Sequence, residues 1–84
     1  MEDNAIKELQ DLLQTLAEAL VDEPDKIEIN PSEDDNTVVL ELRVAEDDMG
    51  RVIGKGGRRA QAIRSIMKAK ASRLNHRVAV NIVD

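Results

Sequence analysis

The chain has 84 residues without cysteine, Phe, Tyr or Trp, and its 17 acids and 12 bases give a formal net charge of −5. This length fits one domain, residues 1–84, with a modest hydrophobic core. The composition excludes disulfides and thiolate metal sites, and no N-terminal stretch has the character of a signal peptide or membrane span. We therefore expect a cytoplasmic protein that is not bound to a membrane.

Acidic and basic residues are segregated along the chain. Residues 1–50 contain 16 of the acids and three of the bases, whereas residues 51–84 contain nine bases and one acid, Asp84. A basic segment can be a solvated helix face that pairs with acids elsewhere. It can also form a basic surface on an acidic body, which is typical of a polyanion-binding protein. A glycine-rich loop in the same segment favours the second interpretation.

The first helix and strand are predicted from hydrophobic periodicity. Residues 4–21 carry apolar residues at helical spacing, so this helix covers a small sheet or forms a seam with another helix. Residues 26–30 alternate with period two and predict a strand with Ile27 and Ile29 facing inward. Residues 31–36 consist of turn-forming types and predict a solvated hairpin loop.

Residues 37–44 form the clearest predicted strand, because every second residue is apolar. A short helix is expected to begin after it, with the acids of residues 46–48 in its first turn. These acids could instead form a carboxylate cluster for acid–base or metal chemistry. No histidine or further ligand accompanies them, so we expect neither a metal nor a cofactor.

The second half of the chain predicts a helix over residues 58–74 and a strand over residues 77–83. The inward positions of this helix are Ala60, Ile63, Met67, Ala71 and Leu74, with Ile66 beside them. Asn75 is expected to be its left-handed cap. The order helix, strand, strand, helix, helix, strand predicts an α+β fold, with a three-stranded sheet and three helices packed on one face.

Between the last two helices lies the sequence V-I-G-K-G-G, residues 52–57, followed by two arginines. Glycine lets a backbone approach an anion closely, and the start of the next helix offers free N–H groups. A Walker A loop has another spacing, and a dinucleotide-binding loop would need glycine at Arg59, so both nucleotide sites are excluded. Gly50, one helical turn before Gly54, further predicts close packing of two backbones.

The V-I-G-K-G-G run between two helices, continued by Ala60 and Ile63, resembles the loop of a KH domain. KH domains bind single-stranded nucleic acid, and their GxxG loop clamps about four nucleotides. The element order is similar to the type II KH arrangement over essentially the whole chain. The length is similar to that of the small bacterial single-KH proteins of the KhpA (YlqC-like) family. This resemblance implies an RNA chaperone or post-transcriptional regulator, a homodimer, and a larger multi-module KH-domain protein as a further partner.

The residues expected to bind single-stranded RNA are Arg51, Val52, Ile53, Gly54, Lys55, Gly56, Gly57, Arg58 and Arg59. We expect the N–H groups of residues 55–57 and the cations to bind phosphate oxygens, and Val52 and Ile53 to line a groove for bases. Without aromatic stacking, micromolar binding with little sequence preference is expected. The competing hypothesis is a dimerisation or partner-binding module in which RNA is secondary. An enzyme is disfavoured because no nucleophile–base pair is evident.

Overall fold

The computed structural model describes residues 3–83 of the chain. Its helices and strands are α1 (Asp3–Glu18), β1 (Glu28–Asp34), β2 (Thr37–Arg43), α2 (Met49–Ile53), α3 (Arg58–Arg73) and β3 (Arg77–Ile82). Short 3-10 turns lie at Pro24–Lys26, Glu46–Asp48 and Lys55–Gly57. The predicted α+β fold and its element order are therefore confirmed.

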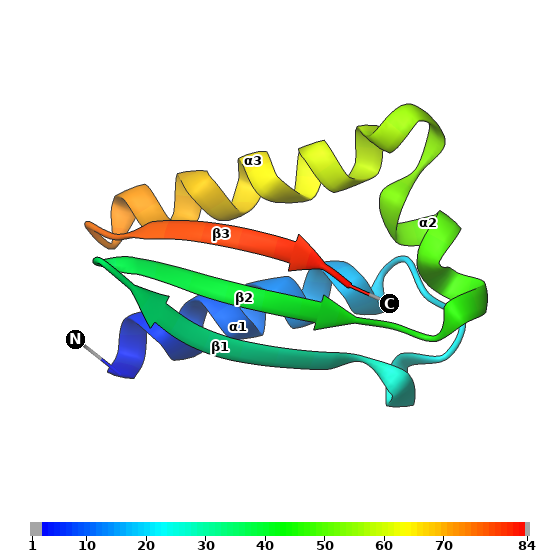
Figure 1. Ribbon diagram of the computed structural model, residues 1–84, viewed down its shortest axis with the longest axis horizontal. Coiled ribbons are helices and arrows are strands. Elements are labelled where there is room, and N and C mark those ends of the chain that lie inside the picture. The colour runs from blue at the N-terminus through cyan, green and yellow to red at the C-terminus, as the bar shows by residue number, and fades with distance from the viewer. Residues whose placement is uncertain (1–2, 84) are drawn as a thin grey trace.

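The three strands form one mixed sheet in the order β1-β2-β3. β1 pairs with β2 in antiparallel fashion, and β2 pairs with β3 in parallel. Figure 1 shows α1 and α3 running along one face of this sheet, while the short α2 lies at the end where β2 and β3 finish. The chain passes from α2 into α3 at that same end, so the glycine loop lies at one extremity of the molecule.

The core lies between the sheet and the two long helices. Its fully buried side chains include Leu9 and Leu13 from α1, Met67 from α3, and Leu40 and Leu42 from β2. These residues recur at helical spacing in α1 and at every second position in β2, as the sequence pattern predicted. The opposite face of the sheet stays polar, which is the usual arrangement for a sheet that is covered on one side.

The hairpin between β1 and β2 differs from the prediction. The strand begins at Glu28 and continues to Asp34, through the stretch that was expected to be a loop. Pro31 is tolerated because β1 is an edge strand, where a missing N–H does not interrupt the sheet. The turn is reduced to Asp35 and Asn36, whose positive φ angles of 49° and 66° match a two-residue hairpin turn.

Two helix predictions also need correction. The first helix ends at Glu18 rather than at residue 21, because Leu20 donates its N–H to Ala17 O in a tightened final turn. Apolar residues beyond that point, such as Val21, still pack against the core, which explains why the apolar periodicity of the sequence continues past the end of the helix. Ile66 was expected to face inward, but its side chain is 45% exposed on the outer face of α3.

Candidate nucleic-acid interface

The loop between α2 and α3 depends on Gly54 for its shape. Gly54 has φ 76° and ψ 174°, a conformation that is essentially restricted to glycine. A Cβ at this position would lie 2.8 Å from Cβ of Arg59 and 2.9 Å from its backbone nitrogen. Gly54 therefore lets the loop pack tightly against the first turn of α3. A Cβ at Gly50 would have no atom within 4 Å, so the predicted backbone contact at Gly50 is wrong.

The opposite side of the loop is open. Gly56 has a φ of 64° and Gly57 a φ of 77°, and a Cβ at either residue would point into empty space. Gly57 donates its N–H to Gly54 O over 3.1 Å, so this donor is engaged within the loop. Within residues 3–83, the N–H groups of Lys55 and Gly56 have no acceptor. Two adjacent backbone donors are thus available for an anion.

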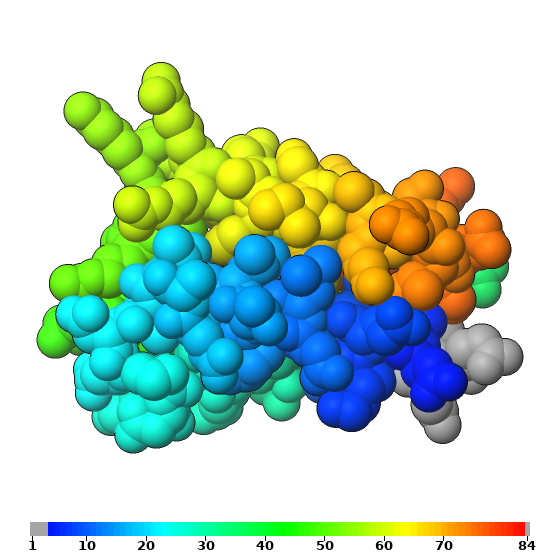
Figure 2. Space-filling view, turned by 180° about the vertical axis from the view of Figure 1, so that it is seen from behind, coloured from blue at the N-terminus to red at the C-terminus, as the bar shows by residue number. Residues whose placement is uncertain are grey.

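The four cations around the loop fall into two pairs. Lys55 and Arg58 are exposed and have no hydrogen-bond or ionic partner in the described part of the chain. Arg51 and Arg59 are held by the protein, since Arg59 Nη1 donates to Arg51 O over 2.9 Å. Figure 2 shows long side chains of this segment, coloured yellow-green, extending from the surface beside α3. Lys55 and Arg58 are therefore the cations most accessible to an anionic ligand.

Asp48 fixes the base of the loop from inside the protein. Its side chain is 1% exposed and accepts backbone N–H groups from Asp22 and Glu23, each over 3.1 Å. Arg51 contacts Asp48 Oδ1 and Asp22 Oδ2, again over 3.1 Å. The N–H of Asp22, followed by that of Glu23 and the Arg51 guanidinium, lowers the pKa of Asp48 despite the opposing effect of burial.

This role of Asp48 was not predicted. The residue was expected to be one of three acids in a helical turn, and the other two, Glu46 and Asp47, are exposed. The backbone N–H groups that Asp48 accepts lie 25 and 26 residues earlier in the chain, so no local spacing links them to it. Arg51 forms ion pairs with this buried carboxylate and with Asp22, and its contact with RNA stays a prediction.

A groove of about 380 Å³ runs from the glycine loop along α3 to the end of β3. It is lined by Ile53, Gly56, Gly57, Ala60, Gln61, Arg64 and Ile82. Val52 and Ile53 were both predicted to line such a groove, but Val52 is fully buried in the core, and of the two Ile53 alone lines the groove. Arg64 and Ile82 were missed because the fold, rather than sequence spacing, brings them beside the loop.

Metal binding and membrane insertion find no support in the described residues. Across residues 3–83, no group of three or more His, Cys, Asp or Glu side chains could hold a metal ion. None of the helices described combines the length and apolarity needed to cross a membrane. The features that remain at the loop are free N–H donors, unpaired cations and an adjoining groove with aliphatic walls, a combination suited to a flexible polyanion.

The chain is similar to known proteins over most of its length. The family model described as "KhpA/KhpB, KH domain" matches residues 10–82. RNA-binding protein KhpA of Caldanaerobacter subterraneus subsp. tengcongensis is 49% identical over 73 residues, covering 87% of this chain and 97% of that protein. RNA-binding protein KhpA of Clostridium acetobutylicum is 47% identical over 75 residues, covering 89% of this chain and 100% of that protein.

A solved structure with a similar fold comes from a larger protein. The crystal structure of an Aquifex aeolicus Era variant bound to GDP.AlF4- matches with a TM-score of 0.66 and 21% identity. The match covers 98% of this chain but 31% of the Era chain, so this chain spans about a third of that protein. At this level of identity the likeness concerns the fold.

Proposed function

Because the chain belongs to the KhpA/KhpB KH-domain family, which is not an enzyme family, we propose that it binds single-stranded RNA by clamping the phosphate backbone at residues 54–57. The relatives described above are named RNA-binding proteins. The observation that carries the proposal is the open side of the loop, where two free N–H groups adjoin two unpaired cations. Both kinds of donor form strong, charge-assisted hydrogen bonds with phosphate oxygens.

The binding mode follows from what surrounds the loop. A phosphodiester lies over Gly56 and Gly57, where no Cβ stands in its way, and Lys55 and Arg58 neutralise its charge. The adjoining bases rest on the aliphatic side chains of Ile53 and Ile82. Aromatic stacking, worth about 1–3 kcal/mol per base, is absent from this chain. Micromolar affinity with little sequence preference follows, which suits a cytoplasmic RNA chaperone or regulator.

A partner-binding function is the second candidate, and an exposed apolar patch on α3 favours it. Ile66 is 45% exposed, and Ala62 and Ala69 lie on the same exposed face of the helix. Small residues around one large apolar side chain allow a second helix to approach closely. A homodimer, or a complex with a larger KH-domain protein, would cover this patch. The leucines of α1 are less suited to this role, since Leu9 and Leu13 are fully buried in the core.

The double substitution Lys55→Asp with Gly56→Asp tests the proposal. Aspartate tolerates the left-handed conformation of Gly56, and both positions are exposed, so the fold should persist. We expect the affinity for a short single-stranded RNA to fall about a hundredfold or more, because two phosphate contacts are replaced by repulsion. Fluorescence anisotropy with a labelled oligouridine measures the affinity, and sedimentation measures self-association.

A control with the same change in charge is Lys26→Asp with Ser32→Asp, since both residues are exposed, lie on or near β1, and belong neither to the loop nor to its groove. The control should bind RNA within about threefold of the wild type. RNA binding that survives the loop substitutions would reject the clamp. If those substitutions abolished self-association and left RNA binding intact, the partner-binding function would be favoured instead.

A further inference from the structure

The side chain of Arg59 crosses the closed side of the glycine loop. Arg59 belongs to the first turn of α3, yet its Nη1 donates a hydrogen bond over 2.9 Å to the carbonyl oxygen of Arg51 in α2. The stem of the same side chain lies against Gly54, since a Cβ at Gly54 would come within 2.8 Å of Cβ and 2.9 Å of Cγ of Arg59. One side chain therefore bridges the two helices that the loop joins.

The carbonyl group that Arg59 contacts lies in the last turn of α2. The last four C=O groups of a helix have no N–H partner within that helix, and a basic side chain can supply one. In α2 the N–H of Gly54 bonds to Gly50 O, and Arg59 supplies a donor to the next carbonyl, that of Arg51. Because α2 has only five residues, it is too short to be stable without such contacts. Arg59 thus caps the C-terminal end of α2.

The rest of α2 is attached to the body of the protein by other contacts. The buried carboxylate of Asp48, directly before α2, accepts N–H groups from the segment after α1, and Val52 is fully buried in the core. The glycine loop follows directly after Ile53. The hydrogen bond of Arg59 therefore holds the end of α2 that carries the loop. Without this guanidinium, the free N–H groups of the loop would be less firmly placed relative to α3.

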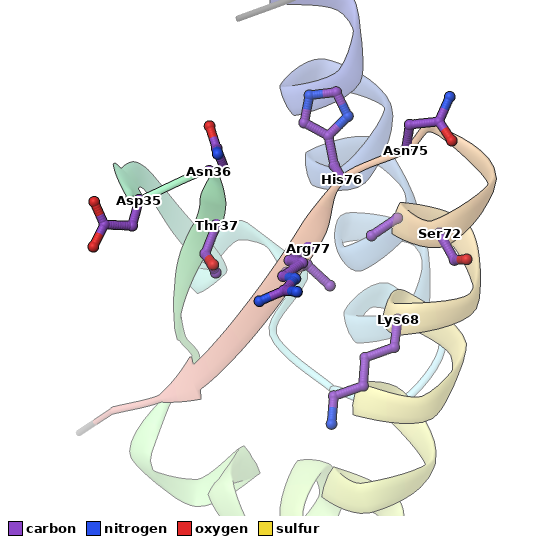
Figure 3. Close-up of a pocket in the computed structure, with 10 residues that line it drawn as sticks. Asp35, Asn36, Thr37, Lys68, Ser72, Asn75, His76 and Arg77 are labelled. Carbon is purple, nitrogen blue, oxygen red and sulfur yellow. The ribbon is translucent and has the colours of Figure 1, made fainter.

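Two other cations of α3 extend into solvent. Figure 3 shows Lys68 extending from α3 beside a pocket of about 940 Å³ that also includes residues of the C-terminal end of the helix. Lys68 and Arg58 are exposed and have no hydrogen-bond or ionic partner within residues 3–83. Arg59 is exposed as well, yet it folds back onto α2 and gives up rotamer freedom in doing so. Its conformation is thus set by the contacts with Arg51 and Gly54.

We propose that Arg59 is a positioning residue of the RNA clamp, which holds the glycine loop in its binding conformation and does not itself neutralise a phosphate. This inference rests on the proposed RNA clamp, and it gives Arg59 a different role from the phosphate contact expected from the sequence. The phosphate contacts then fall to the free cations, Lys55 and Arg58. RNA meets a loop that is already ordered, so less conformational entropy is lost on binding.

The test compares Arg59→Met with Arg58→Met. Both substitutions remove one positive charge from the first turn of α3 and keep an unbranched, flexible stem. Fluorescence anisotropy measures binding of an oligouridine of about four nucleotides between about 0.05 and about 0.2 M salt. Arg58→Met should weaken binding and make the slope of log K against log salt shallower by roughly 0.7, the value for one phosphate contact.

Arg59→Met should instead weaken binding about fivefold at every salt concentration, as expected if the fraction of protein with a competent loop falls to about a fifth. Its salt slope should equal that of the wild type, because no phosphate contact is lost. Loss of stability alone would not produce this pattern, since urea unfolding identifies conditions in which both variants are fully folded.

Amide hydrogen exchange of the protein without RNA provides a second readout. The N–H groups of Gly54 and Gly57 form hydrogen bonds within α2 and the loop. They should exchange at least about fivefold faster in Arg59→Met, because local opening exposes them, and at wild-type rates in Arg58→Met.

The positioning role is overturned if Arg59→Met makes the salt slope shallower as Arg58→Met does, since Arg59 would then bind a phosphate directly. It is equally overturned if Arg59→Met binds RNA with wild-type affinity, or if the exchange of Gly54 and Gly57 does not change. A wild-type protein that bound no RNA would refute the clamp itself. The exchange measurement distinguishes that failure, because it reports on the order of the loop without RNA.

Discussion

At the scale of single residues, the two glycines at positions 50 and 54 have opposite roles. Gly54 adopts a conformation closed to other residues and packs directly against Arg59. Gly50 lies in α2 with open space around it. The sequence shows two glycines one helical turn apart, and only the backbone angles distinguish the one that the loop requires.

Substituting each of these glycines by alanine should therefore change stability in opposite directions. Gly54→Ala is expected to lower the free energy of unfolding by about 2–4 kcal/mol, through backbone strain and the overlap with Arg59. Gly50→Ala should raise it by about 0.5–1 kcal/mol, because alanine is the better helix former. Urea denaturation of both variants measures the difference. Equal effects at the two positions would contradict the assigned geometry.

The conformation of single residues was predictable where neighbouring residue types determine it. Asn75 was expected to be left-handed after the last helix, and its φ is 61°. Turn-forming residues before the second strand were correctly placed in a hairpin, but the strand absorbs most of them because β1 is an edge strand. The pairing register, rather than residue type, determines where such a turn falls.

At the scale of elements, Asp48 joins the segment after α1 to the start of α2. Its two carboxylate oxygens accept hydrogen bonds from the N–H groups of Asp22 and Glu23. The guanidinium of Arg51, in α2, donates a further hydrogen bond to Oδ1 of Asp48. The carbonyl oxygen of Arg51 in turn accepts a hydrogen bond from the guanidinium of Arg59, at the start of α3. One buried carboxylate thus connects the elements on both sides of the glycine loop. A charged group in this position is stable only because every oxygen is occupied.

This connection predicts a pH dependence of stability. The pKa of Asp48 is lowered in the folded chain, so its ionised form stabilises the fold above the ordinary aspartate pKa of about 4. That stabilisation is lost as the pH falls through the lower, folded pKa. The Asp48→Asn variant should unfold at a lower temperature than the wild type at pH 7, because an amide cannot accept hydrogen bonds at both atoms.

The measurement is thermal unfolding between about pH 7 and about pH 2. The variant should lose less stability than the wild type between about pH 5 and about pH 2, since the carboxyl that titrates there is gone. Asp47→Asn is the matched control, because Asp47 is adjacent in sequence and exposed. Identical pH profiles for the wild type and Asp48→Asn would contradict the assigned role of this carboxylate.

The arrangement of elements was largely predictable, whereas the contacts at the loop were not. Periodicity alone located both long helices and the central strand, because their apolar residues face one shared core. The groove at the loop is lined by residues of α2, α3 and β3 that lie up to 29 positions apart in the sequence, from Ile53 to Ile82. The parallel pairing of β2 and β3 places the end of β3 beside the loop. The alternation of apolar residues within each strand does not indicate which strands pair or in which direction.

At the scale of the whole molecule, the charge is separated between two regions. The chain carries a net charge of −5, yet α2, the loop, α3 and β3 together contain nine of its 12 bases. Acids of the first half lie mainly on α1, on the uncovered sheet face and around residues 22–25. A polyanion is attracted to the glycine loop and α3 rather than to α1 or the uncovered sheet face. This separation favours a defined binding path over nonspecific adsorption.

The salt dependence of RNA binding tests the backbone clamp most directly. A clamp that neutralises about two or three phosphates gives a slope of log K against log salt of roughly −1.5 to −2 for an RNA of about four nucleotides. The variant Lys55→Asp with Gly56→Asp should show little binding at any salt concentration. A wild-type affinity that does not change with salt would show that bases, and not phosphates, hold the RNA, and would contradict the clamp.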